Sequence, residues 1–339
     1  MSRRAEVAIT GLGLVLPCGD GREAARTSLR EGRACFIDLP PALGPGRGAA
    51  CTAFNPTGII PPMQLRRLDR PSRFAWVAAH QAFQDAGLDP AAYGGDRIAV
   101  AVGTVTGGSE ASEAFLRPYL VRGPEGASPL LFPNCVANAP SGHLSLAFGL
   151  QGPGATHLER EVAAFSALEQ ALRWLDLGLA DAVLLVGTDG LFPMLMETCA
   201  RAGMLARHGD PRPGSGGGML PGEGAQAFLL ERREDAEARG ARVRALLRGV
   251  ALRPGADESE ASRAEALEAA VANLMEGRPD RWIGGASGHP RLDRVEARLR
   301  AAHPDWPEPL LPKGLWGELC GTGGQLLGAA LLEPAATVL

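Results

Sequence analysis

The side chains that most often carry chemistry occur in this sequence without the spacings of common catalytic motifs. Its six cysteines (18, 35, 51, 135, 199 and 320) form no C-x-x-C pair, and no histidine lies at metal-ligand spacing from them. We therefore predict reduced thiols that pack as small core residues, with no disulfide and no metal site. The glycine-rich stretch 213–224 (PGSGGGMLPGEG) lacks the GK(S/T) ending of a phosphate-binding loop, and neither G-x-S-x-G nor H-E-x-x-H occurs. No nucleotide or other cofactor is expected.

The composition is that of an ordinary globular protein. The chain has 339 residues, a hydrophobic fraction of 45%, a charged fraction of 21% and a formal net charge of -4. This charge argues against a nucleic-acid partner, whose phosphates attract clustered lysines and arginines. The apolar run near the amino terminus is short and broken by glycines, unlike a signal segment, and no run approaches the roughly 20 apolar residues that span a bilayer. We expect a cytoplasmic protein with neither a nucleic-acid nor a membrane partner.

Alternating buried strands and amphipathic helices indicate an α/β fold with a sheet rich in parallel strands. The predicted strands are 7–15, 98–104, 182–190, 224–232 and 243–250, and the predicted helices are 21–31, 72–87, 163–178, 233–240 and 259–275. The glycine-rich stretch 211–224 is predicted to be too flexible to belong to the core. It separates an N-terminal half, about 1–210, from a C-terminal half, about 220–339, of one pseudo-duplicated domain spanning 1–339.

Six segments resemble motifs of the β-ketoacyl carrier-protein synthases and occur in that family's order. They are VAITGLGLVLPCG, RLDRPSRFAWVAAHQAFQDAGL, RIAVAVGTVTGG, PNCVANAPSGHLSLAFGLQGPGAT, MLPGEGAQAFLLE and KGLWGELCGTGG. The resemblance implies a thiolase-like fold, in which two βαβαβ halves form a layered α/β/α/β/α arrangement. Family members continue well beyond the last segment, so the resemblance also implies a truncated C-terminal half with missing or reduced closing strands.

The family's nucleophile is a cysteine at the start of a buried helix, and Glu161 occupies the matching position here, counted from Gly152 and Pro153. Transfer of an acyl chain from a carrier thioester needs a soft nucleophile whose thioester product stays reactive. A carboxylate does not meet this need, so the resemblance implies that the nucleophile is absent. Glu161 can also be interpreted as an exposed acid at a helix start, where the helix dipole favours negative charge.

The family's two catalytic histidines polarise the malonyl thioester carbonyl and stabilise the enolate formed on decarboxylation, in the manner of an oxyanion hole. The second histidine belongs to a K-x-x-x-G-H element, in which the lysine remains here as Lys313 but the histidine is Glu318. The first histidine matches Gly285 or Ala286, depending on one gap. We interpret His289, a few residues downstream, as a loop residue rather than a displaced catalyst.

The resemblance brings Glu161, Glu318 and Lys313 into one pocket. Two carboxylates that share a site repel each other unless a cation lies between them. We therefore predict a Glu–Lys–Glu plug that fills the vestigial active site and holds it rigid. The alternative is a stand-alone decarboxylase or acyltransferase that uses Glu161 and Glu318 as paired catalytic carboxylates, which needs a pocket open to solvent.

Degenerate family members known as chain-length factors lack the cysteine and pair with an active ketosynthase, and this chain resembles them, although their usual replacement is glutamine. The resemblance implies a heterodimer that receives acyl carrier protein and shapes a polyketide or polyene tunnel in a type II fatty-acid or polyketide-like pathway, without turnover by this chain alone. Asn138, Ala139 and Pro140 are the candidates for reaching the partner's tunnel, and His143 lies in a segment similar to a dimer-facing part of the family. An acyl- or pantetheine-binding module is the remaining alternative.

Overall fold

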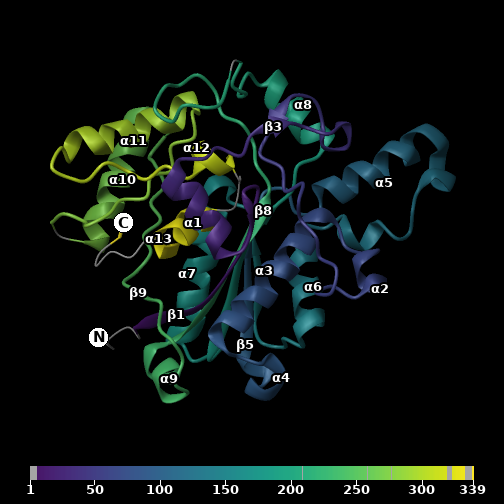
Figure 1. Ribbon diagram of the computed structural model, residues 1–339, viewed down its shortest axis with the longest axis horizontal. Helices are drawn as coiled ribbons and strands as arrows, with labels where there is room; N and C mark the ends of the chain where they lie inside the picture. The colour runs from purple at the N-terminus through teal and green to yellow at the C-terminus, as the bar shows by residue number, and fades with distance from the viewer. Residues whose placement is uncertain (1–5, 208, 258, 276, 319–322, 333–337) are drawn as a thin grey trace.

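A mixed sheet of seven strands runs through the centre of the molecule, in the order β2-β1-β8-β7-β5-β6 with β9 paired to β1 (Figure 1). The computed structural model describes residues 6–207, 209–257, 259–275, 277–318, 323–332 and 338–339. The strands of the sheet are β1 (Val7–Leu16), β2 (Gly19–Asp20), β5 (Ile98–Gly103), β6 (Gly154–His157), β7 (Ala182–Asp189), β8 (Gly224–Arg232) and β9 (Ala245–Leu247). A separate two-stranded sheet joins β3 (Ile37–Asp38) to β4 (Arg47–Gly48).

The helices lie on both faces of the sheet and at its sides. They are α1 (Arg22–Glu31), α2 (Pro62–Leu65), α3 (Arg70–Ala86), α4 (Pro90–Tyr93), α5 (Ser109–Arg122), α6 (Ala139–Phe148), α7 (Ala163–Asp176), α8 (Pro193–Arg201), α9 (Arg233–Ala238), α10 (Glu260–Leu274), α11 (Pro290–Ala302), α12 (Lys313–Trp316) and α13 (Gly324–Leu332). Within the described ranges, none of these helices combines the length and the apolar character that crossing a bilayer requires.

The α/β class is confirmed, but the sheet is less parallel than predicted. Strands β6, β5 and β7 are parallel, whereas β8 runs antiparallel to both β7 and β1. Strand β8 follows the glycine-rich stretch and lies between β1 and β7, so the two halves of the sequence share one sheet. Later in the described chain the backbone makes isolated parallel bridges, between Ile283 and Leu310 and between Arg281 and Val338.

Each face of the sheet carries its own apolar core, because successive residues of a strand point to opposite sides. Helices α3 and α6 cover the face that includes Val100 and Leu184. Helices α1, α7 and α13 cover the face that includes Ala101 and Leu185. All residues of β5 and β7 are buried, as the sequence predicts for strands covered on both sides.

Two glycines interrupt the apolar run of β1 because α3 lies directly on them. A Cβ atom on Gly11 would lie 2.1 Å from the carbonyl oxygen of Ala82, and one on Gly13 would lie 1.9 Å from that of Ala78. No side chain fits at either position. The two glycines therefore allow the backbone of α3 to approach the sheet closely.

A fully buried carboxylate, Glu223, anchors the loops at the start of β8. It accepts a hydrogen bond from the N–H of Cys51 (2.8 Å) and forms an ion pair with Arg70, whose Nε lies 2.6 Å from Oε2. The prediction that residues 211–224 lie outside the core is wrong for the second part of this stretch, since residues 219–224 are all buried. Glycine content alone suggested flexibility there, while the contacts of Glu223 fix the segment.

Asp189, the last residue of β7, holds the loop that follows β5. Its Oδ1 accepts hydrogen bonds from the N–H groups of Val105 (2.8 Å) and Thr106 (2.7 Å). Complete burial raises the pKa of the Asp189 carboxyl to about 7, against the opposing effect of these hydrogen bonds. This loop leads to α5, so Asp189 helps to position that helix.

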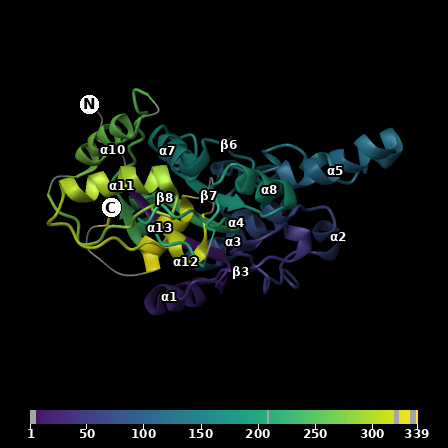
Figure 2. The same cartoon turned by 90° about the horizontal axis from the view of Figure 1, so that it is seen from above.

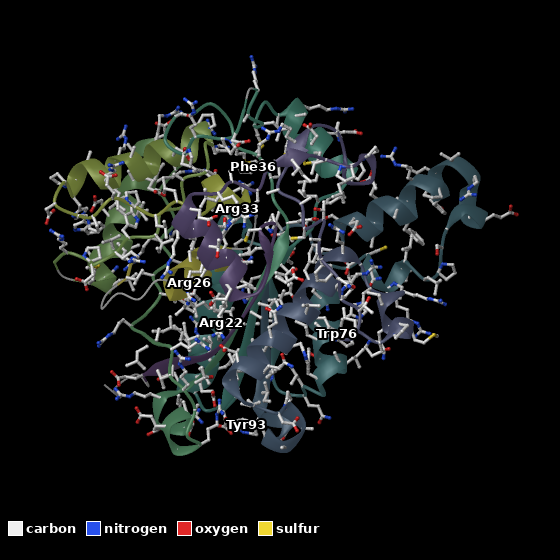
Figure 3. All side chains as sticks on the ribbon, in the orientation of Figure 1. Arg22, Arg26, Arg33, Phe36, Trp76 and Tyr93 are labelled. Carbon is white, nitrogen blue, oxygen red and sulfur yellow. The ribbon has the colours of Figure 1, made fainter. Side chains whose placement is uncertain are left out.

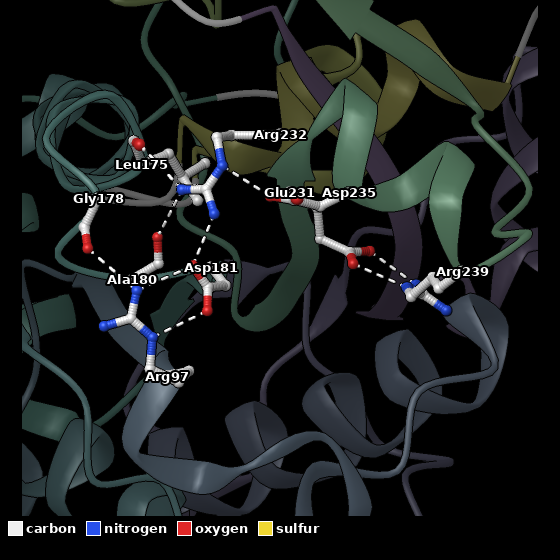
Figure 4. A network of polar contacts seen from close by, with 9 residues as sticks. All are labelled: Arg97, Leu175, Gly178, Ala180, Asp181, Glu231, Arg232, Asp235 and Arg239. Atoms are coloured by element: carbon white, nitrogen blue, oxygen red, sulfur yellow. Dashed lines mark hydrogen bonds and ion pairs between the residues drawn. The ribbon is translucent and has the colours of Figure 1, made fainter.

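Ion pairs connect residues at the start of β7 and the end of β8, which lie at the opposite end of these strands from Asp189 (Figure 4). Asp181 pairs with Arg97 (2.8 Å) and with Arg232 (2.6 Å), and Glu231 pairs with Arg239 (2.7 Å). The hydrogen bonds from Arg97, opposed by partial burial and supported by Arg232, lower the pKa of Asp181 to about 2. Every carboxylate here is engaged by an arginine, which fits a structural network rather than a catalytic one.

Candidate functional site

A buried ion pair joins Lys313 to Glu318, with Nζ 2.6 Å from Oε1 and side chains only 5% and 3% exposed. Lys313 begins the short helix α12, and the turn at Gly317 (φ 87°) brings the chain back to Glu318. The N–H of Glu318 donates to the carbonyl oxygen of Leu220 (2.9 Å). This hydrogen bond attaches the chain after α12 to the residues that precede β8. The structure therefore unites two of the three residues of the predicted plug.

The charge of the same lysine acts on a further acid, Glu296 of α11. Burial raises the pKa of the Glu296 carboxyl to about 7, while hydrogen bonds from Gly285 and Ala286 and the charge of Lys313 oppose the rise. The N–H of Gly285 lies 2.7 Å from Oε2. We call Lys313, Glu318 and Glu296 the acid–lysine cluster. The cluster includes Glu318, and Glu296 binds the backbone of Gly285, so it connects the positions that the sequence resemblance predicts to match the two family histidines.

Sequence reasoning overlooked Glu296, although the sequence holds a signal for it. Asp293, Glu296 and Leu299 lie three residues apart on one side of α11, where Asp293 and Leu299 are buried and Glu296 is half-buried. An acid on the apolar stripe of a helix must have a polar partner in the interior. That partner lies elsewhere in the chain, so the sequence marks the acid without identifying what binds it.

Glu161 lies in a single 3₁₀ turn, Arg160–Val162, that leads into α7, and its side chain is partly exposed. Arg160 has a φ of 52°, a positive value found at no other non-glycine position in the described chain. A Cβ atom on Gly323 would lie 3.3 Å from the carbonyl oxygen of Glu161 and 2.6 Å from the ring of Phe165. The backbone at Glu161 thus borders the start of α13, but pairing of its carboxylate with Lys313 stays a prediction.

Unpaired polar atoms gather around Glu318. Oε2 of Glu318, Oε1 of Gln325 and both amide atoms of Gln226 are buried without a hydrogen-bond partner in the described structure. The amide of Gln325 donates to the carbonyl oxygen of Gly317 (3.3 Å), and a Cβ atom on Gly324 would lie 3.1 Å from Oε1 of Gln226. Unpaired buried polar groups are rare in structural cores and call for an explanation.

The four candidate interface residues lie at the start of α6 and do not form one surface. Asn138 is exposed, whereas Ala139 and Pro140 are buried in the first turn, so only Asn138 is directly accessible to a partner. His143 is half-buried, with Nε2 2.7 Å from Oδ1 of Asn134. Burial lowers the pKa of His143, which fits a neutral side chain in a structural contact.

His289 caps a helix. Its Nδ1 accepts hydrogen bonds from the N–H groups of Arg291 (3.2 Å) and Leu292 (3.4 Å) at the first turn of α11. The ring therefore satisfies free backbone donors at the helix start. This contact agrees with the interpretation of His289 as a structural residue.

Comparison with known proteins points to one family. The sequence model described as "Beta-ketoacyl synthase, N-terminal domain" matches residues 4–236. The 3-oxoacyl-[acyl-carrier-protein] synthase 2 of Staphylococcus aureus (strain COL) is 29% identical over 261 residues, which cover 74% of this chain and 63% of the relative. The chain thus matches less than two thirds of the length of that relative.

Solved structures show the same architecture over nearly the whole chain. A chain of the ishigamide ketosynthase/chain length factor has a TM-score of 0.87 and 26% identity, covering 97% of this chain and 86% of its own. A type II PKS acyl-carrier protein in complex with its ketosynthase bound to the hexaketide gives 0.81 and 19%, with the same coverage. The thiolase-like ketosynthase fold that the sequence resemblance implies is therefore confirmed.

We expect Lys313→Met to destabilise the protein by about 3–5 kcal/mol, because it leaves Glu318 buried without a cation. The double variant Lys313→Met/Glu318→Leu should recover most of this loss, since it removes both charges. Urea unfolding measures both effects. As a control, Arg173→Met breaks the exposed pair with Glu169 and should change the free energy of unfolding by less than about 1 kcal/mol. Losses that simply add in the double variant would contradict the pairing.

We expect the protein to become more stable as the pH falls from about 8 to about 6. The folded-state pKa of Glu296, about 7, lies above its ordinary value of 4.5, so the folded chain binds more protons than the unfolded chain between these values. Asp189 acts in the same direction. Glu296→Gln should reduce the gain in thermal unfolding midpoint, while Glu169→Gln, at an exposed site, should leave it unchanged. Equal gains in all three proteins would show that Glu296 is not buried as described.

Proposed function

The chain belongs to the beta-ketoacyl synthase family, and on that basis we propose that it is a non-condensing subunit, similar to a chain-length factor, that pairs with an active ketosynthase. The proposal rests on one feature of the sequence: the family resemblance, counted from Gly152 and Pro153, places Glu161 at the position of the acyl-accepting cysteine. An acyl chain cannot be held there as a reactive thioester. Glu318 stands at a histidine position, which also removes an enolate-stabilising imidazole.

The state of the acid–lysine cluster supports the loss of catalysis. Glu318 is buried and bound to Lys313, so its carboxylate is engaged rather than free to exchange protons with a substrate. A decarboxylase or acyltransferase that used Glu161 and Glu318 together would need both carboxylates at a solvent-reaching pocket. The burial of Glu318 therefore favours the non-condensing function over this alternative.

An exposed apolar face supports a partner subunit. Helix α5 extends away from the body of the molecule (Figures 1 and 2), although it carries large apolar side chains that are open to solvent. We define the apolar face by ten exposed residues on α5, α6 and the segments beside them: Leu116, Tyr119, Leu120, Val121, Leu130, Phe132, Val136, Leu146, Leu158 and Val162. Large exposed apolar patches mark protein interfaces. An apolar area of this kind fits a permanent rather than a transient partner.

The sheet offers a second point of contact. Strand β6 lies at the edge of the sheet, where the described structure pairs it with β5 on one side only. A free strand edge presents unpaired backbone groups that a strand from another chain can complete. Leu158 of the apolar face follows β6 directly in the chain, and Val162 lies in the 3₁₀ turn that comes next.

The comparisons support the choice of partner. One structural neighbour is described as a ketosynthase/chain length factor, and another as an acyl-carrier protein in complex with its ketosynthase. By analogy, the partner of this chain is a ketosynthase with an intact Cys-His-His set, and the pair receives an acyl carrier protein. This chain would contribute to the tunnel that holds the growing product.

Co-expression with such a ketosynthase tests the proposal. We expect a one-to-one complex on size-exclusion chromatography with light scattering. Leu120→Asp should weaken the complex at least about tenfold, because a charge would have to be buried in the interface. Leu177→Asp, which changes an exposed leucine outside the apolar face, is the matched control and should leave the complex intact. No complex with the unmodified chain, or equal weakening by both variants, would contradict the proposed assembly.

A further inference from the structure

Helix α5 and the segment that returns from it form an arm, residues 109–133, that projects from the body of the molecule. Only one of the 14 residues of α5 is buried, and in Figure 3 most side chains of the outer part of this helix stand away from the body. The return segment packs on α5: the ring centroids of Phe115 and Phe132 lie 5.8 Å apart, and a Cβ atom on Gly126 would collide with the carbonyl oxygen of Pro118. The arm is therefore held together mainly by its own contacts.

Two carboxylates at the base of the arm attach it to two other helices. Oε2 of Glu110 accepts a hydrogen bond from the N–H of Arg70 (3.2 Å), the first residue of α3. Oε2 of Glu113 accepts one from the N–H of Met194 (3.1 Å) in the first turn of α8. Backbone N–H groups in the first turn of a helix have no acceptor within that helix. Each carboxylate of the arm therefore supplies an acceptor that the other helix lacks.

The contact region between the arm and the start of α3 is only partly filled. A cavity of about 160 Å³ lies there, and its lining includes Asp69 and Arg73 from the α3 side and Glu110 and Leu131 from the arm. Oδ2 of Asp69 and Nε of Arg73 are buried without a hydrogen-bond partner in the part of the chain that the structure describes. A region with a cavity and unpaired polar atoms has few contacts to lose when it opens.

Glu110 shares this contact region with several charged groups. Asp69, the N-cap of α3, accepts a hydrogen bond from the N–H of Ser72 (3.2 Å), so two carboxylates bind the same helix start. The guanidinium of Arg70 is already paired with Glu223, at 2.6 Å. The other charged or titratable groups are Arg66, Arg67 and Arg73, which line the cavity, Glu113 on the arm itself, and His143 of α6, whose charge acts on Asp69.

These surroundings favour a neutral Glu110 when the arm is closed. Burial is the largest effect that raises the pKa of the Glu110 carboxyl to about 7, and the charge of Asp69 adds to it. The N–H and the charge of Arg70 oppose the rise, and Glu223 contributes to it. An open arm exposes Glu110 to water, where its ordinary value of 4.5 applies. Since the closed arm binds the proton more tightly than the open arm, a lower pH favours closure.

We propose that the arm is a pH-sensitive element, which closes on α3 and α8 when Glu110 is protonated and opens when Glu110 is charged. It pivots between Gly108, which has a φ of 78° just before α5, and Asn134, whose side-chain amide donates to the carbonyl oxygen of Arg67 (2.6 Å). Asp189 stays with the body, because the loop that it binds ends before Gly108.

The arm carries most of the apolar face, namely Leu116, Tyr119, Leu120, Val121, Leu130 and Phe132. Opening and closing therefore change how this face is presented to a partner subunit. That consequence rests on the proposed function, whereas the movement of the arm itself does not.

Exchange of single backbone amides in the full-length chain tests the movement without a partner. The N–H of Arg70 donates to Glu110 across the contact region, so its protection reports whether the arm is closed. We expect this protection, corrected for the intrinsic exchange rate, to fall about tenfold between pH 6 and pH 8, because the closed arm loses its proton with a midpoint at about pH 7. The N–H of Ser72, which binds Asp69 within α3, is the internal reference and should change little.

Glu110→Gln should keep the Arg70 amide equally protected at both pH values, because the side chain is neutral and its oxygen still accepts the hydrogen bond. Glu125→Gln, which changes an exposed acid on the same arm, is the matched control and should retain the full change. Protection of Arg70 that is independent of pH in the unmodified chain, or that changes equally in Glu110→Gln, would overturn the proposal. Complex formation with a ketosynthase is a separate measurement, so either result leaves the proposed function to its own test.

Discussion

The buried contact between Lys313 and Glu318 is the constraint on which the rest of the candidate site depends. Charges this deeply buried must be paired, because removal from water costs each of them several kcal/mol. The lysine therefore fixes Glu318, and its charge also acts on Glu296, whose carboxylate accepts a hydrogen bond from the N–H of Gly285. Oε1 of Glu318 is therefore held by the lysine, while its Oε2 and the neighbouring Gln325 Oε1 lack a partner in the described structure.

Much of the fold could be predicted from the sequence. Strands β1, β5, β7 and β8 are apolar runs covered on both faces, and their positions follow from local pattern alone. The sheet's antiparallel pairs, the burial of residues 219–224 and the role of Glu223 could not be predicted, because each depends on contacts between distant parts of the chain. The same reason explains the site: Glu161 and Glu318 are identified by motif position, whereas Glu296 acquires its role only when α11 packs beside Lys313.

Features of the surface and of the interior both fit a subunit that acts as part of a complex. The family resemblance places Glu161 and Glu318 where a condensing enzyme has a cysteine and a histidine, while the surface presents exposed apolar side chains and the strand edge of β6. A protein that acts alone gains nothing from such a surface, which favours aggregation.

Acyl transfer measures the central claim most directly. The purified complex with a ketosynthase is incubated with acyl-loaded carrier protein, denatured, and mapped peptide by peptide by mass spectrometry. The account predicts an acyl group on the cysteine of the ketosynthase and none on this chain, because Glu161 cannot hold an acyl group as a thioester. An acyl adduct on this chain in the segment that contains Glu161 would contradict it.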